Sequence, residues 1–416
     1  MSFCGLDFGT SNSTLGAQQG NRLALVPIEG GASTLPSAIF FDFQAAKTLI
    51  GRDAIDAYVR GVEGRFMRSL KSVLGTDLID QDTLLDKHRI GFRDVLARLV
   101  GAIKARAETA LDRPLDAVVH GRPVHFVDGD EAADARAEAA LADIARSAGF
   151  RQVSFQYEPI AAARDYEQQV AREEIALIAD IGGGTSDFSI VRLGPERRAQ
   201  ADRARDILAN DGVRVGGTDF DRLLSLRAVM PHLGYQSSML RPGLLAPNGY
   251  FTDLSTWSKI NFLYTPQIRA ELRQVRREAA RPDLFDRLIA VIEHQYGHRL
   301  AMAVEQAKIG LSEESRYRMD LDWIEPDLMA GITQGQFDEA TAELAQRIGA
   351  MVRRCLDDAG LKPGSIDALF LTGGSTLLGN VRRAILAEVP DARIVEGDKF
   401  GSVGIGLTIE AAIRYR

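Results

Sequence analysis

Two stretches of the chain follow one plan, and they constrain its fold more than any other feature. "CGLDFGTSNSTLGA" at residues 4–17 and "LIADIGGGTSDFSIV" at residues 177–191 both begin apolar, then have Asp, an apolar residue and Gly. Each passes through a turn of small or hydroxyl residues and becomes apolar again. We expect two β-hairpins, because such turns need glycine to reach unusual φ,ψ values. The offset from Asp7 to Asp180 is 173 residues (180 − 7), the size of a domain, so we expect two similar halves.

The turn of the second stretch is suited to phosphate oxygens. It consists of Gly182, Gly183, Gly184 and Thr185. Such a turn exposes several backbone N–H groups with no side chains to block an approaching anion. Taken alone, a tight hairpin that simply needs glycines explains the motif equally well.

Acidic residues flank that turn and indicate a cation. Asp180 and Asp187 would repel phosphate unless a divalent ion, Mg²⁺ with its waters, lies between them. The first stretch repeats the chemistry with Asp7, Gly9, Thr10, Ser11 and Asn12. Two opposed hairpins could therefore hold a polyphosphate from both sides. Neither a P-loop nor a GxGxxG motif of a dinucleotide-binding unit occurs in the sequence.

Elsewhere the pattern is that of an α/β protein. Residues 115–126 alternate as a strand and lead into an Ala-rich amphipathic helix ended by Gly149. "RQVSFQYEPIAAARDYEQQ" predicts a strand, a Pro-marked turn and a helix. Alternation of this kind predicts mixed sheets covered on both faces. Residues 255–315 have few strand signals, and we expect an inserted helical subdomain there.

A third glycine turn, "TGGSTLLGN" at residues 372–380, enters a predicted helix. It would present free N–H groups and a helix N-terminus to an anion or a polar ring. Taken alone, capping of that helix by Ser375 or Thr376 is the simpler interpretation. His294 and His298 are spaced i, i+4 and could bind a metal, but without a third ligand we interpret them as part of a surface helix.

Composition narrows the class of protein. A length of 416 residues predicts two or three domains, and a net charge of −7 gives no basic field to attract nucleic acid or an anionic membrane. The presence of only two cysteines, Cys4 and Cys355, argues against a disulfide framework, and we expect both in the core. No signal peptide or long apolar run is evident, so we expect a cytoplasmic protein.

Six motifs together carry a resemblance to a known family. They are, in chain order, "GLDFGTSNS", "YEPIAAARDY", "DIGGGTSDFSI", "RVGGTDFDRLL", "EQAKIGLS" and "LTGGSTLL". Their order and spacing resemble the ATPase domain of the seventy-kilodalton heat-shock protein (DnaK) family, within the actin-like ATPase superfamily. The variants "GRPVHF" and "GDKFGSVGIGL" look closest to the short YegD-type putative chaperones. The resemblance implies an α/β actin-like fold with two lobes, each a ribonuclease-H-like mixed sheet flanked by helices, and a nucleotide cleft between them.

The resemblance also implies an order of domains. Residues 1–170 would form lobe I, and residues 171–390 would form lobe II with an inserted helical subdomain at about 222–315. Residues 391–416 would return to lobe I. We expect no peptide-binding domain, because the sequence stops at "GLTIEAAIRYR".

The family's catalytic roles can be carried over residue by residue. Asp7 and Asp180 would hold Mg²⁺ through its waters. Lys71 would help to place the attacking water, and Glu158 and Asp187 would orient or deprotonate it. Taken without the resemblance, Glu158 could instead cap a helix and Asp187 could brace its hairpin. The nucleotide's phosphates would be held by Gly9, Thr10, Ser11, Asn12, Gly182, Gly183, Gly184 and Thr185, with Gly216 and Gly217 beside them.

The nucleoside would lie among residues from two motifs. Glu305, Lys308 and Ser312 share one helical face and could reach the ribose and the adenine edge. From the other side would come Gly373, Gly374 and Ser375, with Asp398 nearby. Two positions depart from the family, because Ile309 and Leu377 stand where it has arginines. Loss of these guanidinium groups would weaken ATP binding or change how the base sits.

The resemblance implies an ATP-binding, chaperone-like protein that hydrolyses ATP slowly with Mg²⁺, coupled to opening and closing of the lobes. Its partners would be a nucleotide and an unidentified co-chaperone or client, with neither nucleic acid nor membrane. Two alternatives stay open. One is a nucleotide-sensing scaffold or filament protein with little turnover. The other is a small-molecule kinase, which would need an acceptor pocket with its own base.

Overall fold

The computed structural model describes residues 2–86, 88–198 and 203–415. These residues form two compact units. The larger unit takes its residues from 1–217, 346–377 and 381–416, and the smaller one from 218–345 and 378–380. In the described part of the chain, no helix has the length and apolar character needed to cross a membrane.

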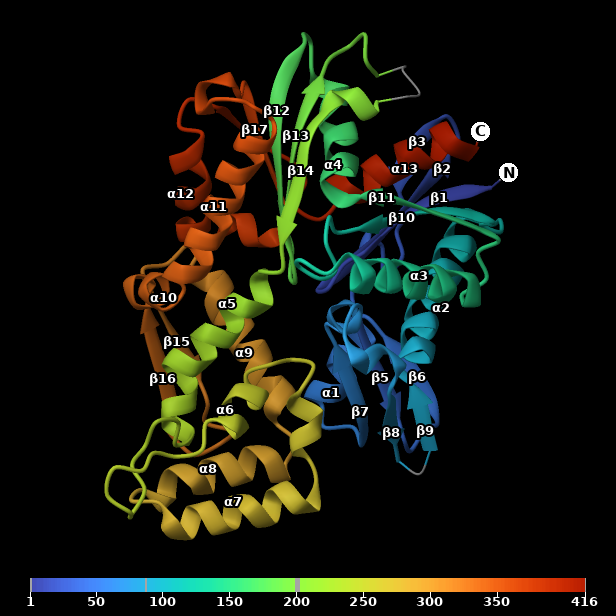
Figure 1. Cartoon of the computed structure of the whole chain (residues 1–416). Coiled ribbons are helices and arrows are strands. Elements are labelled where there is room, and N and C mark those ends of the chain that lie inside the picture. Colours follow the sequence, from blue (N-terminus) through green and yellow to red (C-terminus); the bar gives the residue numbers. More distant parts are fainter. Residues whose placement is uncertain (1, 87, 199–202, 416) are drawn as a thin grey trace. The chain divides into compact units, whose positions relative to one another are not determined.

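The first sheet of the larger unit has the order β11-β10-β1-β2-β3, with β4 paired to β2. Its strands are β1 (Phe3–Phe8), β2 (Asn12–Gln19), β3 (Arg22–Leu25), β4 (Thr34–Pro36), β10 (Ala117–Arg122) and β11 (Gln152–Tyr157). β2 runs antiparallel to β1, whereas β10 and β11 run parallel to it. The sheet is therefore mixed, with its N-terminal strand in the centre (Figure 1).

The second sheet repeats the order and directions of the five main strands of the first and, among the described residues, has no counterpart of β4. Its order is β14-β13-β12-β17-β18, again with an antiparallel hairpin on one side of the first strand and parallel strands on the other. The strands are β12 (Glu174–Ile181), β13 (Ser186–Leu193), β14 (Ile207–Val213), β17 (Ala368–Thr372) and β18 (Arg393–Glu396). The expectation of two similar halves with mixed sheets is thus confirmed (Figure 1).

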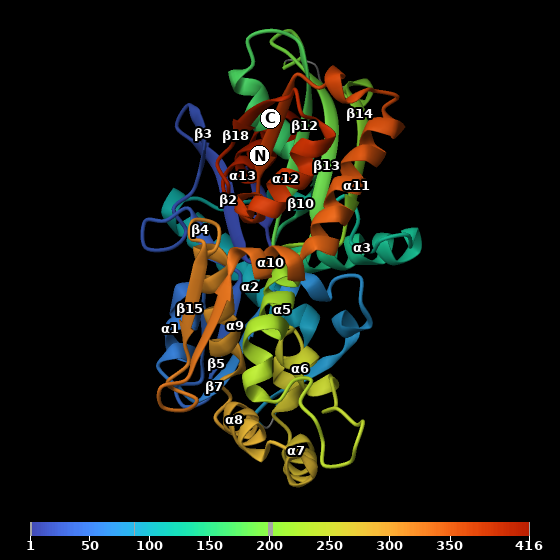
Figure 2. The same cartoon turned by 90° about the vertical axis from the view of Figure 1, so that its left-hand side faces the viewer.

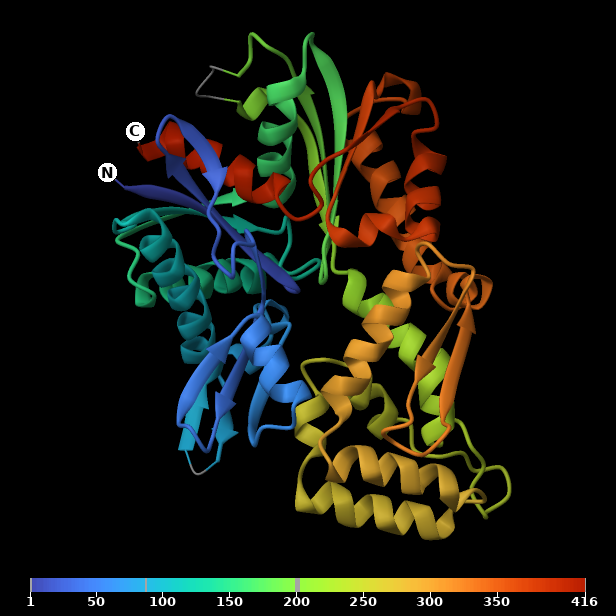
Figure 3. The ribbon, with the colours of Figure 1, turned by 180° about the vertical axis from the view of Figure 1, so that it is seen from behind.

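Helices cover both faces of each sheet. They are α2 (Phe92–Leu111), α3 (Glu131–Ser147), α4 (Glu158–Tyr166), α11 (Ala342–Asp358), α12 (Gly379–Glu388) and α13 (Ser402–Tyr415). Figures 1 and 3 show α11 and α12 on one face of the second sheet and α4 on the other. The Ala-rich helix predicted before Gly149 is α3, whose first turn is capped by the Asp130 side chain. The proline after β11 lies in the first turn of α4 and not in a separate turn.

Smaller elements extend the first half of the unit. They are β5 (Ala38–Asp42), β6 (Lys47–Ile50), α1 (Arg52–Val59), β7 (Gly64–Arg68), β8 (Asp82–Leu85) and β9 (His88–Gly91). A 3₁₀ turn at Leu70–Val73 follows β7, entered through Ser69 in the left-handed region at φ 59°. Lys71 belongs to this turn.

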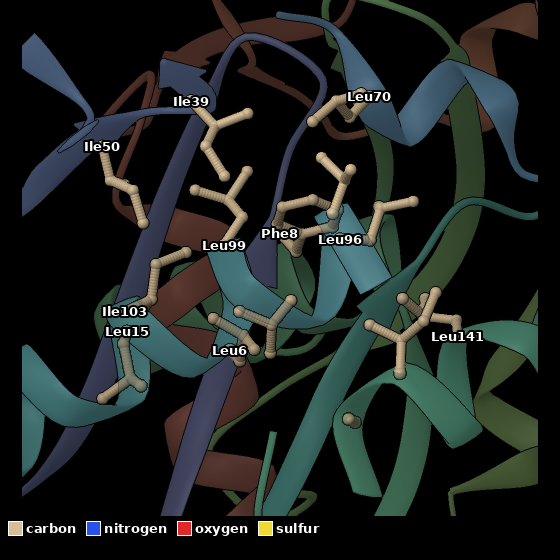
Figure 4. Close-up of a cluster of buried hydrophobic side chains, with 14 of the residues drawn as sticks. Leu6, Phe8, Leu15, Ile39, Ile50, Leu70, Leu96, Leu99, Ile103 and Leu141 are labelled. Atoms are coloured by element: carbon tan, nitrogen blue, oxygen red, sulfur yellow. The ribbon is translucent and has the colours of Figure 1, made fainter. Parts of the chain in front are cut away.

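The core of the first half lies where the first sheet meets α2 and α3. Alternation along β1 sends Cys4, Leu6 and Phe8 to this side. They pack there against leucine and isoleucine side chains of α2, such as Leu96 and Ile103 (Figure 4). Cys4 and Cys355 are both buried and unpaired, as expected from the cysteine count.

A second core joins the two sheets through α4 and α13. α13 packs on β1 and β10, and α4 packs on β12 and β13. The two helices cross with almost no side chain between them. A Cβ on Gly406 would lie 1.7 Å from the carbonyl oxygen of Ala161. The two halves are therefore joined by a backbone-to-backbone helix contact.

The smaller unit is mostly helical and includes one β-hairpin. Its elements are α5 (Gly217–Leu224), α6 (Gly249–Leu254), α7 (Pro266–Glu278), α8 (Pro282–Glu293), α9 (Gly297–Gly310), β15 (Arg316–Asp320), β16 (Met329–Thr333) and α10 (Gln334–Ala340). Figure 2 labels the hairpin beside α9 and α5. The helical tract predicted at 255–315 belongs to this unit. The predicted lobe boundaries at residues 170 and 390 stay predictions.

One local expectation was wrong. His294 and His298 do not share a surface helix, because α8 ends at Glu293 and α9 begins at Gly297. His298 is buried and stacked on Trp257 at 5.7 Å between ring centroids. It packs as an aromatic side chain of the interior.

Candidate functional site

The two glycine-containing stretches form hairpins with the same register. In the first, Phe8 pairs with Ser13 and Asp7 with Thr14. In the second, Ile181 pairs with Ser186 and Asp180 with Asp187. Every pair in one hairpin corresponds to a pair 173 residues later in the other, so the turns 9–12 and 182–185 are structurally equivalent. The counterpart of Asp187 in the first hairpin is Thr14.

Alternation along the two first strands brings Asp7 and Asp180 toward each other. Asp7 lies on the same face of β1 as Phe3, which is the face that packs toward α13. Asp180 lies on the same face of β12 as Ile178, which is the face that packs toward α4. Each aspartate thus extends the inner face of its sheet beyond the apolar core. Their charges interact, because Asp7 is among the groups that raise the pKa of Asp180.

A buried ion pair lies beside these aspartates. Nζ of Lys71 is 2.5 Å from Oε1 of Glu158, although the two residues are 87 positions apart in sequence. Their side chains are 8% and 9% exposed. Glu158 is the first residue of α4, so the beginning of this helix sets its position. The sequence expectation that Glu158 could cap α4 is not met, since Tyr157 occupies the N-cap position.

Asp187 uses its two carboxylate oxygens differently. Oδ1 accepts a hydrogen bond of 2.6 Å from the backbone N–H of Val124, in the loop after β10. Oδ2 is buried and has no hydrogen-bond partner among the described residues. Such an atom is costly to bury unless a ligand or water completes its hydrogen bonding. Oδ2 of Asp187 is therefore a candidate contact for a ligand or a water.

The side chain of Arg122 fixes the loop that contacts Asp187. Its guanidinium donates to the carbonyls of Pro123 and Val124, and it forms ion pairs with Asp134 and Glu138 of α3. No sequence pattern indicated this brace, because its partners lie on different elements. A cavity of about 990 Å³ adjoins the loop and is lined by Val124, His125, Asp211, Gly212 and Arg354, among others.

Burial and neighbouring carboxylates raise the pKa values of Asp7, Asp180 and Asp187. Burial raises the pKa of Asp7 to about 7; Glu158 adds to the rise and Lys71 opposes it. Burial also raises the pKa of Asp187 to about 7; Glu158 again adds, while the nearby Thr185 side chain and the backbone N–H of Val124 oppose the rise. Burial, Glu158 and Asp187 raise the pKa of Asp180 well above its usual value. Four carboxyl groups thus share one ammonium group in a buried site, which favours an added cation.

The two turns touch each other. A Cβ on Gly183 would lie 2.4 Å from Oγ of Ser11, and one on Gly184 would lie 2.8 Å from Oγ1 of Thr10. These hydroxyl groups therefore lie directly over the glycine backbone. In the first turn, the carbonyl oxygen of Gly9 accepts a hydrogen bond of 2.7 Å from the hydroxyl group of Ser37.

Three predicted motifs meet at one carbonyl group. The oxygen of Gly182 accepts hydrogen bonds from the N–H of Gly217 at 2.9 Å and from Oγ of Ser375 at 3.0 Å. Gly216 lies so close that a Cβ there would be 2.5 Å from the carbonyl carbon of Gly183. The structure therefore brings the "GGGT", "VGGT" and "TGGS" glycines together around the second turn.

The third glycine turn follows β17 directly. Gly373 has φ 82°, and a Cβ there would lie 2.4 Å from the carbonyl oxygen of Ile181, so the turn is pressed against β12. The interpretation of Ser375 or Thr376 as a helix cap is wrong. α12 begins only at Gly379, and Thr376 donates to the carbonyl of Gly373 within a 3₁₀ turn.

The other predicted nucleoside residues lie in the smaller unit. Glu305 and Lys308 are on α9, and Nζ of Lys308 is 2.9 Å from Oδ1 of Asp221. Ser312 does not share their helical face, because α9 ends at Gly310 and the Ser312 hydroxyl donates to the carbonyl of Ile309. The predicted part of Glu305 and Lys308 in nucleoside binding stays a prediction.

Comparison with known families agrees with this geometry. The profile of the family described as Hsp70 protein matches residues 3–230 and 290–414. The chain belongs to the Hsp70 protein family. The match includes both hairpins, Lys71, Glu158 and the third glycine turn, whereas residues 231–289 of the smaller unit lie outside it. Membership of the Hsp70 family supports an ATP-binding, chaperone-like protein with an actin-like two-lobe fold.

The donor set fits a magnesium ion held through water. Among the described residues, no three carboxylate, imidazole or thiol groups converge closely enough to ligate a metal directly. Mg²⁺ commonly keeps several waters and binds protein carboxylates and substrate phosphates around them. Asp7 and Asp180 lie next to the two glycine turns with raised pKa values, and a hydrated cation beside them would lower these pKa values and keep both carboxylates ionised.

Proposed function

We propose that this member of the Hsp70 family binds ATP with Mg²⁺ at the two hairpin turns and hydrolyses it slowly. The observation that carries the proposal is the Asp187 carboxyl group. One of its oxygens is fixed by Val124, and the other is buried without a partner in the described part of the chain. An oriented carboxylate with one open oxygen is the arrangement that positions and deprotonates a water.

The residues divide the work of phosphoryl transfer between them. Backbone groups of Gly183 and Gly184, with the hydroxyl groups of Thr10 and Thr185, would hold the β- and γ-phosphates. A water hydrogen-bonded to Oδ2 of Asp187 would attack the γ-phosphorus. The bond from that phosphorus to the β,γ-bridging oxygen would break, releasing ADP, and Asp187 would accept the proton of the water. Positioning and electrostatics dominate such a reaction.

The ion pair between Lys71 and Glu158 supports separate roles for Lys71 and Asp187. Because Glu158 is occupied by Lys71, it is less suited than Asp187 to accept the proton. The ammonium group of Lys71 would instead stabilise the charge on the γ-phosphate and keep the water in line. Bound Mg²⁺, held by Asp7 and Asp180 through water, would supply neutralising charge for the phosphates.

Motion of the two sheets about the helix contact of α4 and α13 would couple hydrolysis to a partner. The partner is a co-chaperone or client that the sequence does not identify. A closer relation to the short YegD-type members and a cytoplasmic location belong to the same proposal.

The test combines calorimetry and single-turnover kinetics. Wild type should bind ATP in the presence of Mg²⁺, and Asp180→Asn should weaken that binding. Wild type should release phosphate in a single turnover. Lys71→Ala and Thr185→Ala should still bind ATP but should release no phosphate. Absence of binding by wild type, or binding unchanged in Asp180→Asn, would refute the proposal. Tight binding without phosphate release would support the scaffold alternative.

A further inference from the structure

An exposed aromatic ring lies next to the third glycine turn. Phe400 belongs to the connection from β18 to α13, drawn in red in Figure 3, and its side chain is 46% exposed. Burial of large apolar side chains is favourable, so an aromatic ring left half in solvent is a candidate for contact with a ligand.

The backbone around Phe400 is held in place. Oδ1 of Asp398 accepts the N–H of Phe400 at 3.1 Å, and the carbonyl of Asp398 accepts the N–H of Ser402 at 3.1 Å. Asp398, which was predicted to lie near the nucleoside, thus fixes the turn that carries the aromatic residue. The ring is presented from a turn with defined hydrogen bonds.

The ring of Phe400 rests against Gly374. A Cβ on Gly374 would lie 3.3 Å and 3.5 Å from ring atoms Cε1 and Cζ, which is contact distance. The adjacent residues are anchored to the phosphate hairpin, since Gly373 packs on Ile181 and Ser375 donates to Gly182. Phe400 is therefore fixed relative to the turn that would hold the phosphates.

Leu377 provides a second exposed apolar side chain, at the third glycine turn. It ends the 3₁₀ turn Gly374–Leu377 and is 38% exposed. Neither Leu377 nor Phe400 offers a charge or a hydrogen bond from its side chain. Their chemistry suits a flat, weakly polar group, whose faces can stack on an aromatic ring.

We propose that Phe400 is the stacking platform for the purine ring of the bound nucleotide, with Leu377 of the third glycine turn as a second apolar contact. The inference rests on the proposed nucleotide binding at the two hairpins. Purine faces stack on aromatic side chains, and loss of one such contact weakens binding by about tenfold or more. In this chain, aromatic and apolar contact at the base would replace the cation–π contact that arginine at position 377 would make.

The experiment separates the base from the phosphates. Affinities for MgATP and for inorganic tripolyphosphate with Mg²⁺ are measured by calorimetry for wild type, Phe400→Ala and Phe400→Trp. Phe262→Ala is the matched control, because Phe262 is 44% exposed and lies in the smaller unit. Phe400→Ala should weaken ATP binding about tenfold and leave tripolyphosphate binding unchanged. Phe400→Trp should retain ATP binding, with its added tryptophan fluorescence quenched by ATP and not by tripolyphosphate.

Three results would overturn the assignment. In the first, Phe400→Ala binds ATP as tightly as wild type. In the second, it weakens ATP and tripolyphosphate equally, which indicates a structural role for the turn. In the third, Phe262→Ala weakens ATP binding as much as Phe400→Ala. Failure of the proposed function is distinguishable from these, because wild type would then bind neither ligand.

Discussion

The ammonium group of Lys71 lies 2.5 Å from the carboxylate of Glu158, with both side chains buried beside Asp7 and Asp187. Burial alone would lower the pKa of the Lys71 ammonium group. The negative charges of Glu158, Asp7 and Asp187 have the larger effect, so the pKa is raised. Lys71 is therefore charged at neutral pH and carries the positive charge that this group of carboxylates requires.

Lys71→Ala should destabilise the nucleotide-free protein by about 3 kcal/mol, because it leaves Glu158 buried without its partner. Urea unfolding at neutral pH measures the change. Lys259→Ala is the control, since the pair of Lys259 with Asp253 is exposed and should contribute at most about 1 kcal/mol. Combining Lys71→Met with Glu158→Gln should recover much of the lost stability. An equal loss for Lys71→Ala and Lys259→Ala would contradict this account of the pair.

Asp187→Asn should lower the single-turnover rate of ATP hydrolysis by about 10²- to 10⁴-fold, because an amide cannot accept the proton of the water. ATP affinity should change little, since the amide oxygen can still accept the N–H of Val124. Asp367→Asn provides the comparison, as Asp367 accepts the N–H of Ile175 at the other end of β12. Hydrolysis by Asp187→Asn at the wild-type rate would remove Asp187 from the mechanism.

Gly216→Ala should displace the second turn, because the new Cβ would lie 2.5 Å from backbone atoms of Gly183 and Gly184. Overpacking of this kind typically costs about 1–3 kcal/mol. Nucleotide binding should weaken together with thermal stability. Gly335→Ala meets nothing within 4 Å and should be neutral or slightly stabilising. If both variants keep wild-type melting temperature and ATP affinity, the contact of Gly216 with the turn is unimportant.

His120 should make the protein sensitive to acid. Burial lowers the pKa of His120 to about 4; the hydrogen bond to Gly121 opposes this fall and Lys71 adds to it. The unfolded chain takes up a proton below about pH 6.5 and the folded chain does not, so stability is lost as pH falls from 6.5 toward 4. The expected contribution is about 1.4 kcal/mol at pH 5.5.

The measurement for His120 is denaturant unfolding at pH 7.5 and 5.5. His120→Gln should lose less stability on acidification than wild type. His294→Gln alters an exposed histidine and should behave as wild type. Identical losses in wild type and His120→Gln would show that other groups determine the acid response.

Local signals allowed the hairpins and the α/β alternation to be predicted. Glycine turns between apolar runs specify a hairpin and its register, and so Asp7 and Asp180 could be matched by their positions in the two motifs. The Ala-rich, Gly-terminated pattern of α3 was equally clear. The expectations for Ser375 and Ser312 failed, because α12 begins only at Gly379 and α9 already ends at Gly310.

Long-range contacts could not be predicted from periodicity. The pair of Lys71 and Glu158 joins a 3₁₀ turn to a helix 87 positions later. The contact of Val124 with Asp187 depends on how two sheets pack together. The sequence did not lead to the proposal for Phe400, although an aromatic residue in the turn-forming sequence "GDKFGS" is a visible signal.

The shared register of the two hairpins has a chemical consequence. Thr14 occupies in the first half the position that Asp187 occupies in the second, and its hydroxyl group is buried without a hydrogen-bond partner among the described residues. A threonine hydroxyl cannot act as a base near neutral pH, whereas a carboxylate can. The two halves thus share a topology and differ in chemistry at this position. If a polyphosphate binds between the two turns, its terminal phosphate would be expected to face the half that carries Asp187.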